Sequence, residues 1–104
     1  MTDLQQVTLK RGATFRYTAS LYSVDAGVRT LIPLDDYTIT AAVRTAGGRM
    51  IATLDTSIDT GADTYVCELD DTSAWPIDTL RWITTFVTPT GDEQVLTILV
   101  NVEV

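Results

Sequence analysis

Residues 72–86 carry the sequence TSAWPIDTLRWITTF, which indicates most directly how this chain folds. The first half is a polar turn that ends in Trp75 and Pro76, and proline drives the residue before it out of helical geometry. The second half alternates in character, as expected for a strand, where successive side chains point to opposite faces. Its large apolar residues of one parity are Leu80, Trp82 and Phe86. The stretch therefore predicts a core strand over 80–87 that is entered through a corner.

The same period of two recurs along the whole chain, and no segment shows a sustained helical period. Predicted strands cover 4–10, 14–22, 28–32, 37–43, 49–55, 64–69, 80–87 and 94–104. Turns or loops separate them, and the clearest are 25–27, 46–48, 56–63 and 88–92. Residues 71–75 are expected to form at most one short helical turn. Short strands with regular turn signals predict a single all-β domain over 1–104, an antiparallel β-sandwich of about 7–9 short strands.

Composition narrows the classes of partner. The chain has 104 residues, with 14 acidic and 7 basic side chains, no histidine and a formal net charge of −7. This balance argues against nucleic-acid binding, because phosphate contacts need clustered lysine and arginine. The apolar run near the C-terminus is broken by Thr97 and Asn101, so no membrane span is predicted. Residues 1–6 lack the basic start and apolar stretch of a secretion signal, and we expect synthesis in the cytosol.

Residue types that carry catalysis are scarce. Without histidine, hydrolytic triads and HExxH-type zinc sites are excluded. The acidic pairs Asp35-Asp36 and Asp70-Asp71 could bind calcium or act as paired carboxylates, but capping of backbone amides is favoured because neither has a calcium-loop pattern. Cys67 is the only cysteine and falls inside a predicted strand, so we expect a buried structural thiol. We predict no catalytic residue, cofactor or metal.

Most aromatic rings fall on the inward parity of the predicted strands, and these are Tyr17, Tyr37, Tyr65 and Trp82. Core packing is the expected role of these rings, because large buried rings dominate the energetics of small cores. Tyr22 and Trp75 lie outside this pattern. They could form a ligand face at one loop end, which keeps open a carbohydrate-binding or adhesin-type β-sandwich module as the alternative function.

Four motifs together resemble a family of small proteins from tailed phages and prophages. They are LKRGATF at 9–15, the segment 34–48 with LxxYTITAAVRxxGG, DTSAWPxxxLRW at 71–82, and TxxVxV at 97–102. In this respect the chain is similar to the immunoglobulin-like N-terminal domain of lower-baseplate upper proteins. The resemblance implies an immunoglobulin-like antiparallel β-sandwich that docks receptor-binding apparatus onto a tail. The chain departs from antibody domains, because only Cys67 and Trp82 of their Cys-Trp-Cys arrangement are present.

The resemblance implies a non-enzymatic virion structural protein, a tail or baseplate adaptor that acts by protein-protein contact. Because the chain ends just past its last predicted strand, we expect a stand-alone module. The expected partners are other phage tail or baseplate proteins and further copies of the chain, with no nucleic acid and no membrane. Its expected location is the virion, after assembly in the bacterial cytoplasm.

Exposed strand edges are the expected contact sites, because unpaired backbone groups there can pair with another chain. The two predicted segments are 28–32 and 95–99. Their predicted interface residues are Val28, Thr30, Ile32, Val95, Thr97 and Leu99. Apolar side chains on both parities of the last strand indicate that it is partly covered on both sides.

Overall fold

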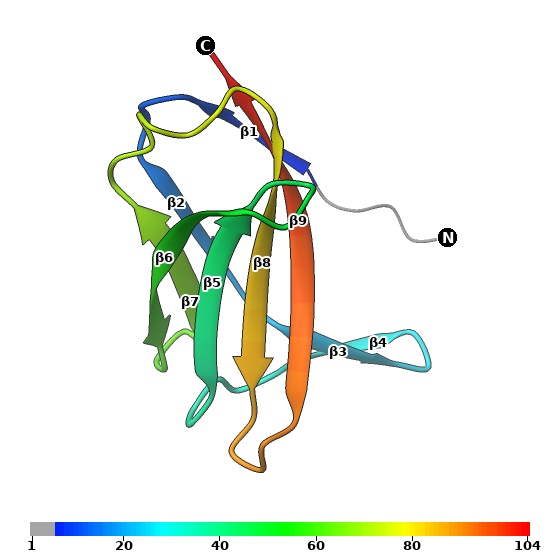
Figure 1. Ribbon diagram of the computed structural model, residues 1–104. Coiled ribbons are helices and arrows are strands. Elements are labelled where there is room, and N and C mark those ends of the chain that lie inside the picture. The colour runs from blue at the N-terminus through cyan, green and yellow to red at the C-terminus, as the bar shows by residue number, and fades with distance from the viewer. Residues whose placement is uncertain (1–5) are drawn as a thin grey trace.

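The computed structural model describes residues 6–104 (Figure 1), and within that range it contains strands but no helix. The nine strands are β1 (Gln6–Lys10), β2 (Phe15–Ala19), β3 (Tyr22–Asp25), β4 (Val28–Leu31), β5 (Thr38–Arg44), β6 (Met50–Asp59), β7 (Thr64–Leu69), β8 (Thr79–Val87) and β9 (Glu93–Glu103). No helix of the described part of the chain could cross a membrane. The all-β prediction is confirmed.

Seven strands form one sheet in the order β1-β9-β8-β5-β6-β7-β2. Its pairs are antiparallel except for β1 and β9, which run parallel with Gln6 opposite Leu99 and Lys10 opposite Glu103. The sheet is therefore mixed, and the prediction of a purely antiparallel arrangement is wrong at this edge. Parallel neighbours need a long connection, and here almost the whole chain separates the two strands. The predicted first strand began at Leu4, which lies outside the described residues.

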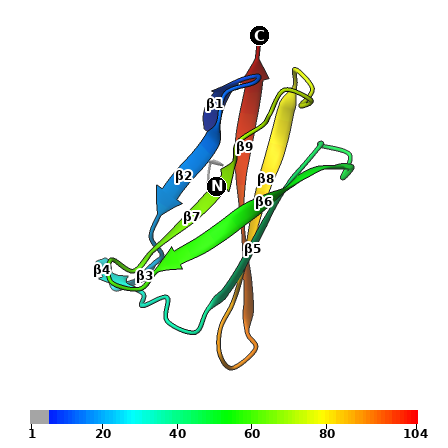
Figure 2. The ribbon, with the colours of Figure 1, turned by 90° about the vertical axis from the view of Figure 1, so that its left-hand side faces the viewer.

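The sheet curls because β6 takes part in both of its halves. Residues 50–54 of β6 pair with β5, whereas residues 55–59 pair with β7. Figure 2 shows the β7-β2 half turned over the β9-β8-β5 half, so that the sheet is nearly barrel-shaped. The predicted loop over 56–63 is wrong in its first part, since β6 continues to Asp59. The strand persists there because Ile58 packs against the core and the Thr56 hydroxyl donates to the Ile39 carbonyl at 2.7 Å.

The core lies between the two halves of the curled sheet. Trp82 of β8 meets Phe15 of β2 edge to face, with ring centroids 5.0 Å apart. Tyr65 of β7 meets Phe86 of β8 in the same manner at 5.1 Å. The predicted core positions of Trp82, Tyr65 and Cys67 are confirmed, since each is almost fully buried. The loop residue Leu34 is also fully buried, which its position between Pro33 and two aspartates did not indicate.

The predicted strand over 14–22 ends early, at Ala19, and a separate hairpin begins at Tyr22. Among the described residues, β3 of this hairpin pairs only with β4, in a two-stranded sheet of its own. The predicted turn over 25–27 is confirmed, with positive φ at Ala26 (50°) and Gly27 (81°), as a two-residue hairpin turn of this type requires. Figure 1 shows the hairpin projecting sideways past β9. We call residues 22–31 the arm.

Candidate interaction surface

The outer side of the β9-β8-β5 half gathers side chains from four strands. Burial alternates along β8, so its odd-numbered residues point outward while residues 80–86 of even number are buried. The strand register then brings Thr97, Ile83, Ala42 and Thr53 into one row. We define the front face by the outward residues Thr40, Ala42, Arg44, Met50, Thr53, Arg81, Ile83, Thr85, Val95, Thr97 and Leu99. It combines threonine and apolar side chains over several strands.

The front face is cationic although the whole chain is acidic. Its two charged members, Arg44 and Arg81, lie opposite each other on β5 and β8. Within residues 6–104 neither arginine has a carboxylate at salt-bridge distance. Arg44 Nη1 instead donates to the carbonyl of Gly48 at 2.9 Å. Glu93 and Glu103 share the outward parity of β9 but lie near its two ends. Two neighbouring arginines, without a carboxylate at salt-bridge distance within residues 6–104, make the middle of the face attractive to an acidic group.

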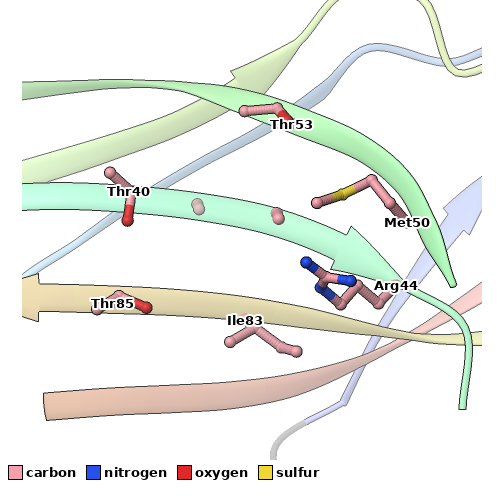
Figure 3. A pocket seen from close by; sticks show the side chains of 8 residues that line it. Thr40, Arg44, Met50, Thr53, Ile83 and Thr85 are labelled. Atoms are coloured by element: carbon pink, nitrogen blue, oxygen red, sulfur yellow. The ribbon is translucent and has the colours of Figure 1, made fainter. Parts of the chain in front are cut away.

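A shallow hollow of about 280 Å³ lies in the front face. Figure 3 shows its rim, with Thr40 and Arg44 from β5, Met50 and Thr53 from β6, and Ile83 and Thr85 from β8. The hollow exists because Ala42, between Thr40 and Arg44 on the outward side of β5, has only a methyl group. Its size is at the lower limit for small-molecule sites, which enclose roughly 300–1,000 Å³. Such an open hollow suits a protruding side chain of another protein.

The outer side of the other half has the opposite charge. We define the back face by the outward residues Arg16, Thr18, Asp55, Ser57, Asp59, Thr64, Val66 and Glu68. Three of these are carboxylates and one is a guanidinium, which lies 3.6 Å from Glu68 in an exposed pair. An exposed pair of this kind contributes at most about 1 kcal/mol. Val66 is the single aliphatic member, so the back face offers charge but little apolar surface.

The arm is exposed along its whole length, with all residues of both strands in solvent. The register separates its side chains into two sides. One side, the Tyr22 side, carries Tyr22, Val24, Arg29 and Leu31, and the Arg29 guanidinium lies over the Tyr22 ring at 4.3 Å. The other side, the Val28 side, carries Ser23, Asp25, Val28 and Thr30. An isolated two-stranded hairpin is at best marginally stable in water, so exposed apolar residues here indicate a contact surface.

The predicted interface residues fall into two groups in space. Val95, Thr97 and Leu99 all lie on the front face. Val28 and Thr30 lie together on the Val28 side of the arm, and Ile32 lies at the base of that side, where its N–H donates to the Leu21 carbonyl at 2.9 Å. The segment 95–99 is not simply an edge, because β8 pairs with all of it and β1 pairs with Leu99. Its outward side chains, rather than its backbone, are what it presents.

Sequence reasoning missed the partners of these residues across the strands. Arg44, Arg81, Ile83 and Ala42 complete the front face. The sequence did contain one signal for this face. Ile83 is an aliphatic residue on the outward parity of the central strand, just as Val95 and Leu99 are on the last strand.

Tyr22 and Trp75 do not form a common ligand face. Trp75 is only 3% exposed and packs against Phe15, with centroids 5.6 Å apart. Trp75, which the alternative function needs as part of a ligand face, is therefore a core residue instead. The Thr72–Trp75 turn, closed by the Trp75 N–H donating to the Thr72 carbonyl at 3.1 Å, directs the indole inward. Tyr22 is 46% exposed on the arm, but Arg29 covers one side of its ring.

The acidic pairs lie in loops, and no group of three possible metal ligands is found within residues 6–104. Asp71 caps its turn, since one carboxylate oxygen accepts from the Ser73 N–H at 2.9 Å and from the Ser73 hydroxyl at 2.6 Å. These hydrogen bonds lower the pKa of Asp71, as expected when donors stabilise a carboxylate. At Asp71 the capping interpretation is confirmed.

The buried titratable groups are held in their neutral forms. Burial raises the pKa of the Cys67 thiol, and the nearby Thr84 and Trp82 side chains oppose that rise. Trp82 Nε1 nevertheless has no partner at hydrogen-bond geometry among the described residues, so its contact with the sulfur is weak. Burial, with a smaller contribution from Cys67, raises the pKa of Tyr65 to about 12. A neutral thiol is a poor nucleophile, so Cys67 acts as a core residue.

Comparison with known protein families and with curated proteins finds no match to this sequence.

Proposed function

We propose that this protein is a non-enzymatic structural component of a phage or prophage virion, a tail or baseplate adaptor that acts by protein-protein contact. The observation that carries the proposal is the front face. It presents Ile83, Val95 and Leu99 together with Arg44 and Arg81, while Glu93 and Glu103 lie beyond it, near the two ends of β9. Patches that combine apolar side chains and arginine are typical of protein interfaces.

The motif resemblance supplies the biological setting of this proposal. Its residues are those of turns and core, such as the Gly12 corner before Phe15 and the Trp75-Pro76 corner before β8. We propose that the curled sheet is an immunoglobulin-like sandwich, with β6 crossing between two layers. In support, Phe15 and Trp82 meet from opposite halves of the sheet. After synthesis in the bacterial cytoplasm, the protein would become part of the particle.

The alternative, a carbohydrate-binding or adhesin-type module, is less well supported. Sugar platforms need an exposed ring, and of the two rings available Trp75 is buried in the core while Arg29 stacks on Tyr22. A glycan array probed with the purified protein tests this alternative, which requires binding that is lost in Tyr22→Ala.

Immunogold electron microscopy tests the proposed function directly. Antibodies against the purified chain are applied to particles released from a host that encodes it. We expect gold at the tails or at their distal ends. Particles that carry no label, with the protein confined to the soluble fraction, would exclude a virion role.

A further inference from the structure

The Val28 side of the arm and the front face have complementary charge. The Val28 side carries the carboxylate of Asp25 next to Val28, which is 64% exposed. The front face carries Arg44 and Arg81, which lie opposite each other on the paired strands β5 and β8. When opposite charges meet across an interface with apolar surroundings, they favour one partner over others and fix its orientation.

Charge also decides which side of the arm can be used. The Tyr22 side has more apolar surface, but Arg29 lies on it, stacked over the ring. That guanidinium would meet Arg44 and Arg81 with like charge, which disfavours the contact. The Val28 side has no cation, and its carboxylate meets two arginines that have no carboxylate partner within residues 6–104.

The shapes of the arm and of the hollow also favour a contact between the Val28 side and the front face. The arm projects past β9, away from the curled sheet of its own chain (Figure 1). Val28 stands near its tip, directly after the two-residue turn. The hollow above Ala42 is shallow and open, with Ile83 and Met50 at its rim (Figure 3). A single aliphatic side chain at the end of a thin ribbon can reach such a hollow.

We propose that the front face receives the arm of a second copy of this chain, with Val28 over the hollow at Ala42 and Asp25 beside Arg44 and Arg81. The inference deepens the proposed adaptor function and rests on it for its biological setting, whereas the contact is a property of the purified chain. Arm and front face are different surfaces, so the contact is heterologous, and each copy can donate one arm and accept another.

The contact is small. The arm has four residues in each strand, fewer than the roughly 20–30 residues that each side of a standard interface engages. We therefore expect association that is reversed by dilution and weakened by salt, because its charged groups are exposed.

Light scattering coupled to size-exclusion chromatography, over a wide concentration range, tests the contact. The wild-type mass should rise with concentration. Val28→Lys should weaken association by about tenfold or more, since it places a cation against the two arginines. Val24→Lys is the matched control, because Val24 is as exposed (69%) but lies on the opposite side of the arm. Equal effects of the two substitutions, or a wild-type chain that stays monomeric, would overturn the proposal.

A charge exchange tests the pairing itself. Asp25→Arg and Arg81→Asp should each be monomeric alone. Their mixture should regain association, because the unaltered arm of Arg81→Asp can bind the unaltered front face of Asp25→Arg. Arg16→Glu on the back face is the control and should behave as wild type. A mixture that remains monomeric contradicts the pairing. If Arg81→Asp does not fold, as judged by circular dichroism, Arg44→Asp takes its place.

The two proposals fail separately. If tails are labelled but the purified chain stays monomeric, the arm contact is rejected and the virion role is supported. If the chain self-associates and the variants change this association as expected, but particles carry no label, the arm contact is supported and the virion role is rejected.

Discussion

The side-chain hydroxyl of Thr72 accepts a hydrogen bond from the backbone N–H of Gly12 at 2.9 Å, across 60 positions of sequence. The same hydroxyl donates to the Ala13 carbonyl at 2.6 Å, and Thr72 is fully buried. β1 and β2 stand at opposite ends of the sheet order and are not paired with each other. The corner at Gly12 and Ala13 joins β1 to β2, and so connects the two ends of the curled sheet. Thr72 links this corner by hydrogen bonds to the turn that precedes β8.

Replacing Thr72 by valine should lower the free energy of unfolding by about 1–3 kcal/mol, because two part-buried hydrogen bonds, to the Gly12 N–H and the Ala13 carbonyl, are lost at about 0.5–1.5 kcal/mol each. Urea unfolding followed by tryptophan fluorescence measures the change. Thr72→Ser keeps the hydroxyl and should retain most of the stability. Equal losses in both variants would show that the methyl group, not the hydrogen bonds, is what matters.

Replacing Trp82 by alanine should cost about 3–5 kcal/mol, comparable with the whole stability of a small domain. Trp82 contacts both Phe15 and Tyr17, at centroid distances of 5.0 and 5.2 Å, and so links β8 to β2. We expect a chain that is unfolded or close to it by circular dichroism. Trp82→Phe, which keeps a ring, should lose less. An unchanged melting curve in Trp82→Ala contradicts this account of the core.

Alkaline pH should destabilise the fold. The folded pKa values of Cys67 and Tyr65 are raised above their ordinary values of 9.0 and 10.0, the latter to about 12. The unfolded chain therefore loses these protons first, so stability is complete below about pH 9 and declines as the pH rises toward 12. Urea midpoints between pH 7 and 12 measure this decline. Tyr65→Phe should show a smaller decline, and identical pH profiles would refute the role of Tyr65.

The Cys67 thiol should resist labelling in the native protein and react once the chain unfolds. The side chain is fully buried, so the reagent cannot reach the sulfur, and its pKa is raised, so little of the reactive thiolate is present. A chromogenic disulfide reagent, added with and without urea, measures the rate. Rapid labelling of the folded chain would contradict the buried position.

Replacing Ala26 by asparagine should make the arm more rigid. Ala26 has φ of 50°, and asparagine before glycine is preferred in this turn because it adopts the left-handed region more readily. Hydrogen exchange of the amides in 22–31 should slow by severalfold, with exchange in β8 unchanged. Faster exchange in the arm would be the contrary result.

Local alternation predicted most strands and most of the core. Leu80, Trp82 and Phe86 are buried as expected, and Cys67 shares their environment. Alternation says nothing about Trp75, because a residue in a turn has no parity and its direction depends on the hydrogen bonds that close the turn. The sequence prediction is wrong after Asp55, where a polar run was predicted as a loop but β6 continues to Asp59.

The candidate surface was predictable only in part. Val95, Thr97 and Leu99, like Val28 and Thr30, were predicted as interface residues of an exposed strand edge, whereas β8 pairs with all of 95–99 and the segment presents its outward side chains. Their neighbours could not be identified, because Arg44 and Arg81 become adjacent only through the register of β5 and β8.

The sequence by itself determined the all-β character, the positions of most turns and which side chains of each strand point inward. These properties depend on neighbouring residues, since strand geometry repeats every two positions. Only the tertiary structure decided the parallel pairing of β1 with β9, the curl at β6 and the separation of the arm from β2. Pairing between distant strands depends on how the whole set of apolar faces closes over one core, and no short stretch contains that information.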